Sequence, residues 1–496
     1  MTRTLPPREV PPAAPPSTAI SGRLELGAAA VALLGGLLAA LAGPVVTIAT
    51  LGVLAAVGLF AVAAYRPIFA TYIYLGTLPI IAGIDRGNLF PLVRPNEALL
   101  ALLVAGAALG GYLRFCRGEP VPFRLHRLDV PLAGFLLLST VWPLASLMLR
   151  GQLPLITEVV AVLPVCKLVG IYLLVRFTVA TEEQLVRCLR LIIWPGAVVA
   201  VIAILQTLQF GPMLALLEAG WSPEASAGEL SSRGSTTLAS PIATGDYIII
   251  CLVLLLCCGA RGMLDRRERL GLGLVLGTGV LAAGQFSTWI SAVVAGVLIL
   301  WRFPELRRRA KRFLWVVPVA FVVGAPAFIG RLEGFAELGV PISWLGRWDN
   351  LSNFYIPEFG LLEVLIGVSP DPVLDAPETW RDVIYLEAGY LQFLWIGGLP
   401  LLAGFVWLSV EVLRRAKQLT SRPGAVGATA SALEICWWFL LVLTVLDPHL
   451  TLRGTGDLLF AMLAIITGRL CVERSPAERS PAEPSPAEPS PAEGRS

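Results

Sequence analysis

Long apolar runs recur along almost the whole chain and constrain its fold more than any other feature. Each has about the 20 residues that an α-helix needs to cross the hydrocarbon layer of a bilayer. Lipid offers no water to the backbone, so such runs must be helices that satisfy their own hydrogen bonds. We place about fourteen of them along the sequence, at 25–43, 45–64, 67–84, 96–113, 130–149, 154–178, 191–210, 241–259, 270–285, 286–301, 313–329, 389–411, 430–446 and 456–470.

Composition supports this interpretation. The chain is 56% hydrophobic and only 15% charged, which is more apolar surface than a soluble core can bury. Alternating segments of about 10 residues, typical of outer-membrane barrels, do not occur. The sequence therefore predicts an all-α polytopic membrane protein with about 12–14 transmembrane helices in residues 25–470.

Both ends of the chain have a composition that cannot form a core. Residues 1–24 are rich in proline and polar residues, and they are too long before the first apolar run for a normal signal peptide. Residues 471–496 repeat Ser-Pro-Ala-Glu. We expect both segments to be disordered tails.

Basic residues predict the orientation. Clusters around 114–127, 187–190, 261–269, 307–312 and 414–417 alternate with connectors that are nearly free of lysine and arginine. By the positive-inside rule, these clusters and both termini face the cytoplasm. The opposite side then receives two sizeable loops, about 211–240 and 330–388, the second before the third-last helix. We expect a multi-pass membrane protein with both termini in the cytoplasm.

Arginines on the predicted outer side need a separate reason, because positive charge is disfavoured there. One reason is a salt bridge or a headgroup contact. The other is an anion site, since guanidinium groups bind phosphate bidentately. The residues concerned are Arg86, Arg94, Arg150, Arg233, Arg331, Arg347, Arg381 and Arg453.

The shorter outer loop offers one candidate anion site. Arg233 lies in a Gly/Ser/Thr-rich segment that leads to Pro241 at the start of a predicted helix. Small residues let backbone amides approach an anion, and a helix N-terminus adds partial positive charge. An ordinary helix-capping loop explains the same pattern. Asp246, just inside the helix, is either a satisfied polar contact or a partner that orients Arg233.

The longer outer loop offers a candidate base. Glu387 precedes a helix that continues into lipid, where desolvation would make a carboxylate a stronger base. The alternative is an acid that complements the helix dipole. Trp344, Trp348 and Tyr385 are typical of an interfacial aromatic belt, although sugar rings also stack on such side chains.

Within the predicted spans, Glu158 and Lys167 are costly charges, and we expect them to form structural pairs. With only two histidines, and with the cysteines in apolar runs or arginine-rich connectors, the sequence predicts no metal, no cofactor and no disulfide framework. No feature predicts a nucleic-acid partner.

Several motifs, in order, resemble the bacterial O-antigen ligase/polymerase-related membrane glycosyltransferases, over residues of about 230–400. The family's Arg, Gly-Thr-aromatic and Pro-Asn elements are similar to Arg233, Thr236–Leu238 and Pro241, without the Gly and Asn. Its Thr-x-Ser-Arg motif corresponds at best to Phe286–Trp289, without the arginine.

Two later motifs continue the resemblance. An Arg-x-x-x-Trp-like step and a Leu-Leu-Gly-x-Gly turn are similar to Arg347-Trp348 and Leu365–Val368. The His-Asn-x-Tyr-Leu element is matched by Glu387–Leu391, followed by Gly398-Leu399, so that Glu387 replaces the loop histidine. This replacement favours a polymerase over a lipid A ligase.

The resemblance implies a GT-C-like helical fold and a metal-independent transfer of a glycan from undecaprenyl diphosphate on the extracytoplasmic face of the bacterial inner membrane. Partners would be that lipid-linked oligosaccharide, membrane lipids and other polysaccharide-assembly proteins. Catalytic roles would fall to Glu387 and Arg233. Substrate binding would involve Arg331, Arg347, Trp348, Arg94 and Tyr390. A polysaccharide flippase or other multi-pass transporter is the alternative, and a non-catalytic assembly subunit is a third.

Overall fold

The computed structural model describes residues 43–85, 92–119, 125–221, 233–284, 286–304, 307, 342–375 and 383–471. The chain divides into two compact units, Met1–Ala61 and Val62–Ser496. The described residues of the first unit form most of α2 (Gly43–Tyr65), a helix without a charged residue. The elements that follow α2 belong to the second unit.

The second unit is mostly helical. Its apolar helices reproduce the predicted spans in the part of the chain that the structure describes, whereas the predicted spans 25–43 and 313–329 lie outside it. The helices are α3 (Pro67–Ile81), α4 (Pro95–Cys116), α5 (Asp129–Leu149), α6 (Ile156–Ala161), α7 (Leu163–Thr178), α8 (Glu182–Thr207), α9 (Gly211–Trp221), α10 (Pro241–Ala260), α11 (Arg266–Ala282), α12 (Phe286–Arg302), α17 (Gly389–Leu419), α18 (Gly424–Leu443) and α19 (Thr455–Thr467).

Length and hydropathy make this chain a multi-pass membrane protein. Among the described residues, eight candidate spans are long and apolar enough to cross a bilayer, α2 included and with α6 and α7 joined as one. The apolar helices α3, α12 and α19 are shorter. The coarse prediction of an all-α polytopic protein is therefore confirmed, while the count of 12–14 helices and the GT-C-like arrangement stay predictions.

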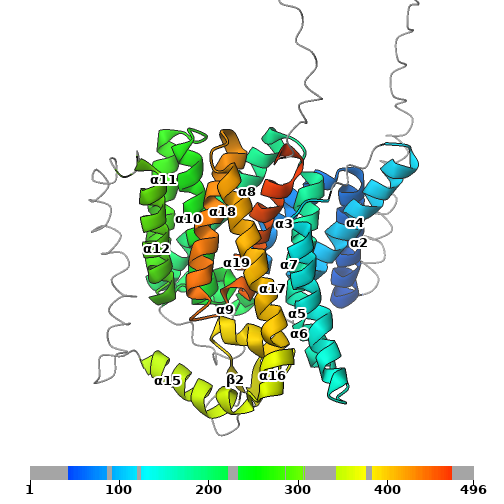
Figure 1. Cartoon of the computed structure of the whole chain (residues 1–496). Coiled ribbons are helices and arrows are strands. Elements are labelled where there is room, and N and C mark those ends of the chain that lie inside the picture. Colours follow the sequence, from blue (N-terminus) through cyan, green and yellow to red (C-terminus); the bar gives the residue numbers. More distant parts are fainter. Residues whose placement is uncertain are drawn as a thin grey trace, which may run out of the picture. The chain divides into compact units, whose positions relative to one another are not determined.

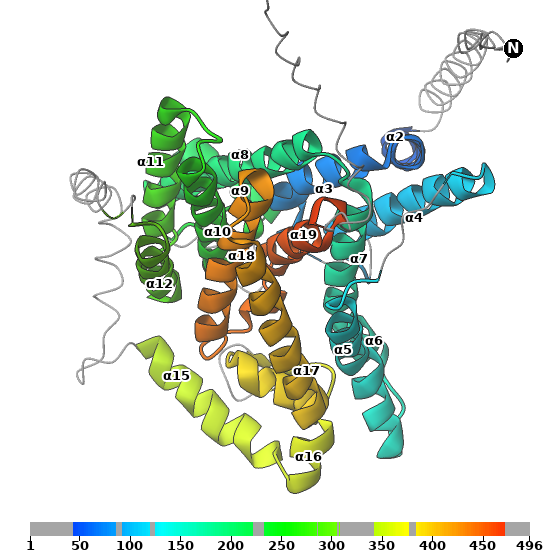
Figure 2. The same ribbon diagram turned by 45° about the horizontal axis from the view of Figure 1, so that its top comes forward.

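The core of the second unit is formed by helices that are apolar on every side. Most side chains of α10 and α18 are buried, and α19 is buried along its whole length. Helices α8, α11 and α18 pack against α10, and α7 packs against α19 (Figures 1 and 2). Other helices turn apolar side chains such as Leu137, Val293 and Trp407 outward, as expected for a surface in contact with lipid.

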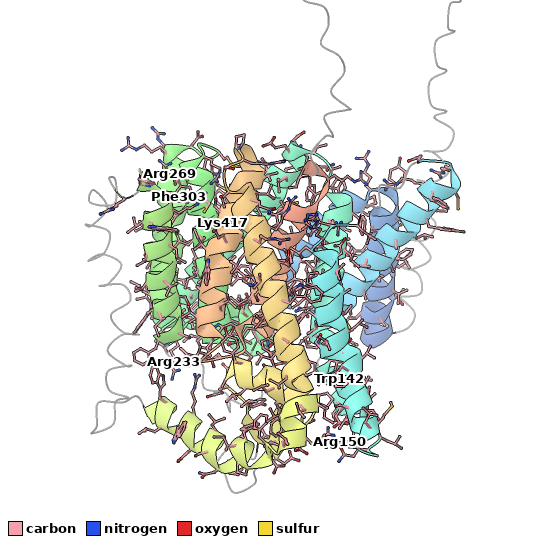
Figure 3. The ribbon with its side chains drawn as sticks, viewed as in Figure 1. Trp142, Arg150, Arg233, Arg269, Phe303 and Lys417 are labelled. Atoms are coloured by element: carbon pink, nitrogen blue, oxygen red, sulfur yellow. The ribbon has the colours of Figure 1, made fainter. Side chains whose placement is uncertain are left out.

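Charged side chains distinguish the two ends of this helical layer. Arg269 and Lys417 lie at one end, which we call the basic end, and Arg150 and Arg233 lie toward the other, which we call the loop end (Figure 3). The elements of the longer predicted loop gather at the loop end. Arg269 and Lys417, from two of the predicted basic clusters, thus lie at the end opposite the long loop, but which end faces the cytoplasm stays a prediction.

Both predicted outer loops contain regular structure. The shorter one includes α9 and the 3₁₀ turn η2 (Thr236–Leu238). The longer one contains α15 (Ile342–Asn350), the π-helical turn η3 (Leu351–Tyr355), η4 (Ile356–Glu358), α16 (Leu361–Ile366), β1 (Val373–Asp375) and β2 (Val383–Tyr385). The two strands pair antiparallel, with Val373 opposite Tyr385. A prediction of a purely helical protein misses this hairpin, because three-residue strands carry too short a pattern.

A small core attaches this region to α17. Tyr355, Ile384, Leu386 and Trp395 bury one another's side chains there. The Tyr355 hydroxyl donates hydrogen bonds to the carbonyls of Pro372 and Ile384, at 2.9 and 3.0 Å. The long loop is therefore a folded part of the second unit.

Helix α17 bends where the loop docks. Gly398 has a φ of 64° inside the helix, a conformation that suits glycine. A Cβ there would lie 2.5 Å from the Leu365 carbonyl oxygen of α16. The Trp142 indole donates to the Gly397 carbonyl at 3.1 Å, and Arg150 donates to the Val368 carbonyl at 2.5 Å. These contacts hold α5, α16 and the bend of α17 together.

Candidate functional site

A cavity of about 200 Å³ lies at the loop end. Helix α15, the approach to α17 and the segment after α18 form its walls. Aromatic rings and aliphatic side chains supply most of the lining, and Arg347 and Glu387 supply charge. The lining residues are Trp344, Arg347, Trp348, Asn350, Leu351, Tyr355, Tyr385, Leu386, Glu387, Ala388, Val445 and Leu446.

Arg347 connects the walls of this cavity. Its Nε lies 2.5 Å from Glu387 Oε2, and its Nη2 lies 3.0 Å from Asp447 Oδ1. Its Nη1 donates at 3.3 Å both to Asp447 Oδ2 and to the Leu446 carbonyl. The bidentate contact with Asp447 uses the planar fork of the guanidinium. Arg347 is therefore neutralised by two carboxylates.

This pairing changes the expected surroundings of Glu387. Its side chain is 35% exposed and in contact with Arg347, so it is less desolvated than the sequence predicted, and its role as a base stays a prediction. Glu387 nonetheless lines the cavity, where its carboxylate is within reach of a ligand. Its partner, rather than burial, sets its electrostatic surroundings.

Asp447 is the buried acid of the group, with a side chain 5% exposed. Burial raises its pKa to about 6, and the nearby Glu387 acts in the same direction, whereas Arg347 and His449 lower it. A pKa in this range suits a group that exchanges a proton near neutral pH. Because Asp447 does not line the cavity, it acts on the cavity through Arg347.

A second buried pair lies behind Asp447. His449 Nδ1 is 2.5 Å from Asp246 Oδ2, and both side chains are fully buried. His449 Nε2 lies 3.9 Å from Asp447 Oδ2. Burial alone would lower the pKa of His449, but the charge and hydrogen bond of Asp246 and the charge of Asp447 raise it. His449 is thus held between two aspartates.

These contacts form one line of polar side chains from the cavity to the interior. The line runs Glu387, Arg347, Asp447, His449 and Asp246, and we call it the polar chain. The Thr455 hydroxyl donates to Asp246 at 3.4 Å. Asp246 was expected to be a satisfied contact or a partner of Arg233. Its Oδ2 is engaged by His449 and Thr455, whereas its buried Oδ1 has no hydrogen-bond partner among the described residues, so the contact is satisfied only in part.

A separate buried cluster surrounds Asp457 in the first turn of α19. Asp457 Oδ2 is 2.9 Å from Lys167 Nζ, and the Tyr74 hydroxyl donates to Asp457 Oδ1 at 2.7 Å. The predicted structural pairing of Lys167 is thus found, with Asp457 as the partner. Glu158 instead accepts the Leu155 amide at 2.7 Å on an exposed surface.

The apolar part of α19 separates these clusters from the basic end. Residues 458–466 are all apolar and buried, and at 1.5 Å per residue they span about 13 Å. Beyond them, Thr467 bonds to Tyr172, which reaches Asp129 and Arg176. The polar chain and the Asp457 cluster thus lie on the loop-end side of this apolar stretch.

The remaining predicted site residues are more scattered. Arg233 is half-buried before η2 at the loop end (Figure 3), and burial lowers the pKa of its guanidinium, which still stays charged at neutral pH. It is absent from the cavity lining, as are Arg94 and Tyr390. Arg94 directly precedes α4, and its amide donates a hydrogen bond to the Glu97 carboxylate at 3.0 Å. The Tyr390 hydroxyl donates to the Leu441 carbonyl at 2.8 Å and joins α17 to α18.

Trp348 and Arg347 are the predicted binding residues that the fold places on the cavity. Arg331 lies outside the described residues. Sequence reasoning missed Asp447 and His449. Their signal was a dense group of charge between the last two apolar runs, where Asp447, His449, Arg453 and Asp457 occur within a single short connector and helix start.

Among the described residues, no group of three or more His, Cys, Asp and Glu side chains could hold a metal ion.

Arg453 stabilises the structure of the loop end. It donates to the Gly83 carbonyl at 2.9 Å and pairs with Asp85. Arg453 thus forms a salt bridge, which was one of the two roles predicted for the outer arginines.

Comparison with known proteins identifies no relative: no family model, no curated protein and no solved structure matches this chain.

Proposed function

We propose that this protein transfers a glycan from undecaprenyl diphosphate to an acceptor sugar on the extracytoplasmic face of a bacterial inner membrane, as a polymerase or ligase of cell-surface polysaccharide. The observation that carries the proposal is the cavity at the loop end, with aromatic walls and an arginine held between two carboxylates. Aromatic faces suit the apolar faces of sugar rings, and the acid and the arginine supply polar contacts.

In this proposal Trp344, Trp348 and Tyr385 hold the sugar rings. Glu387 accepts the proton of the acceptor hydroxyl, and the freed oxygen forms the new bond to the anomeric carbon of the donor. The bond from that carbon to the phosphate oxygen breaks, and the diphosphate leaves with its electron pair. The displacement inverts the anomeric centre and requires no metal.

Arginine supplies the electrostatic part of the mechanism. Arg233 neutralises the charge that builds on the departing diphosphate, helped by Arg331, and this lowers the barrier. Arg347 has a different role from the expected phosphate clamp, because Glu387 and Asp447 already neutralise it. It holds Glu387 at the cavity wall. The sequence similarities to the family motifs agree with these roles. They include Arg233, and Glu387 at the position of the family's loop histidine.

The test is complementation of a strain that lacks the gene and its surface polymer. Arg233→Ala and Glu387→Gln are each expressed beside the wild type, and polymer length is followed on gels. Arg187→Ala is the matched control, because Arg187 forms an exposed i,i+4 pair with Glu183. We expect short or absent polymer from the two site variants and normal polymer from the control. Wild-type polymer from both, at equal protein levels, overturns the proposal.

A transporter is the second candidate, and buried charge favours it. Lys167 with Asp457, and His449 with Asp246, are ionisable pairs of the kind found along proton paths. The apolar stretch 458–466 of α19 argues against it, because it leaves about 13 Å of this helix without a polar group. In the deletion strain, lipid-linked single repeats outside the membrane favour a polymerase, and repeats retained inside favour a flippase.

A further inference from the structure

Helix α15 exposes large apolar side chains both on its cavity side and away from it. Trp344, Arg347 and Trp348 have the i, i+3, i+4 spacing of one helix face, and all three line the cavity. Leu345 is not among the lining residues and is 42% exposed. A helix that borders water normally turns its apolar side chains inward. The exposure of Leu345 therefore indicates that the medium beside α15 is not water alone.

The elements that follow α15 continue the same surface. Ile356 of η4 is exposed, and so are Leu361, Leu362 and Leu365 of α16, with Leu361 at 83%. Leaving an apolar side chain of this size in water costs roughly 1.5–3 kcal/mol relative to burying it. Four such side chains within ten residues form an apolar patch that monomeric soluble proteins rarely leave uncovered.

This patch is continuous with the lipid-facing side of the helices. Helix α16 packs directly on the bend of α17, where a Cβ at Gly367 would lie 2.7 Å from the Ile396 carbonyl oxygen. Beyond the bend, α17 exposes Leu399, Val406 and Trp407. In both ribbon views α15 and α16 lie at the loop ends of α17 and α18, with α15 crossing the direction of these helices (Figures 1 and 2).

We propose that α15 and α16 lie in the interfacial layer of the bilayer, with the exposed leucine side chains of both helices among lipid headgroups and upper acyl chains. Tryptophan is enriched at this depth, and amphipathic helices lie there in the plane of the membrane. The partner is the lipid surface itself. The cavity beneath α15 then opens at the level of the lipid phosphates. This inference is independent of the reaction proposed above.

The test measures how deeply α16 is immersed. The full-length protein, with the exposed Cys116 and Cys166 replaced by serine, is placed in nanodiscs of phosphatidylethanolamine and phosphatidylglycerol. A nitroxide spin label is attached through Leu361→Cys, or through Leu345→Cys in a second variant. Asp375→Cys provides the control, because Asp375 is an exposed acid at the end of β1 in the same loop.

Relaxation by oxygen, which concentrates in lipid, is compared with relaxation by a water-soluble nickel chelate. We expect oxygen to dominate at positions 361 and 345, and nickel to dominate at 375. Nickel dominance at 361 and 345 overturns the proposal. Low access to both reagents at these positions also overturns it, because it would mean that protein, such as a second copy of the chain, covers the patch. An unchanged melting temperature verifies that each labelled variant is folded.

Discussion

Arg347 Nη2 lies 3.0 Å from Asp447 Oδ1, across 100 residues of sequence. The contact ties α15 to the turn between α18 and α19. Because Arg347 also contacts Glu387, before α17, a single guanidinium joins three segments around the cavity. The position of α15 therefore depends on the ion pairs of this side chain as well as on the small core around Tyr355.

The first prediction concerns this dependence. Arg347→Gln removes the charge that faces Glu387 and Asp447 and leaves the two carboxylates opposed. Losing hydrogen bonds to charged groups of this kind costs about 2 kcal/mol, so we expect amide hydrogen exchange in residues 344–350 to accelerate by roughly 30-fold. Hydrogen-exchange mass spectrometry on the purified protein measures it.

Arg187→Gln is the control for the loss of an arginine. Arg187 and Glu183 are 61% and 75% exposed, and such pairs contribute little. Exchange in residues 344–350 should be unchanged in this variant. Unchanged exchange in Arg347→Gln as well would mean that packing of Tyr355 and Trp395, rather than the ion pair, fixes this region.

The second prediction concerns the buried charge in α7. Lys167→Met leaves Asp457 buried without its cation, and breaking a buried pair in this way costs about 3–5 kcal/mol. The double variant Lys167→Met with Asp457→Asn should recover most of that loss, because no unpaired charge is left. Thermal unfolding in detergent measures both. Glu158→Gln, on an exposed surface, should leave the melting temperature unchanged.

The helical scaffold was predictable because its signal is local. An apolar run of span length specifies a helix without reference to any other part of the chain, and α5, α10 and α12 follow their predicted runs closely. Bends and short elements were not predictable in this way. The bend at Gly398 depends on the approach of the Leu365 carbonyl, which is a contact between segments.

The site was predictable only in part, for the same reason. Arg347, Trp348 and Glu387 were singled out because charge and aromatic rings are unusual beside a membrane, and the fold brings them together. Their partner Asp447 comes from the segment after α18, and no local pattern links it to Arg347. Tyr390, chosen from a motif, instead joins α17 to α18.

The third prediction tests the bend of α17. Gly398→Ala places a methyl group 2.5 Å from the Leu365 carbonyl and forces a left-handed conformation on alanine, so we expect a loss of roughly 2–4 kcal/mol in stability. Gly277→Ala is the opposite case. Nothing lies within 4 Å of the Cβ that it adds to α11, so a stabilisation of up to about 1 kcal/mol is expected from helix propensity. Equal melting temperatures for the two variants would contradict this account of the bend.

The fourth prediction concerns pH. The folded pKa of Asp447, about 6, lies above its ordinary value of 3.8, so folding binds a proton between these values. The stability that this contributes is fully present below pH 3.8 and is lost as the pH rises through about 6. The pKa of His449 is also raised above 6.5. Its contribution is present below pH 6.5 and is lost as the pH rises through its folded value.

Both groups therefore act in the same direction, and stability should fall from about pH 4 toward pH 8, by about 3 kcal/mol for Asp447. Melting temperatures in detergent across this range measure the fall. Asp447→Asn should remove the part below about pH 6, and His449→Gln should remove the part above pH 6.5. A profile in Asp447→Asn identical to the wild type would show that Asp447 is ionised throughout, and that Arg347 outweighs burial in setting its pKa.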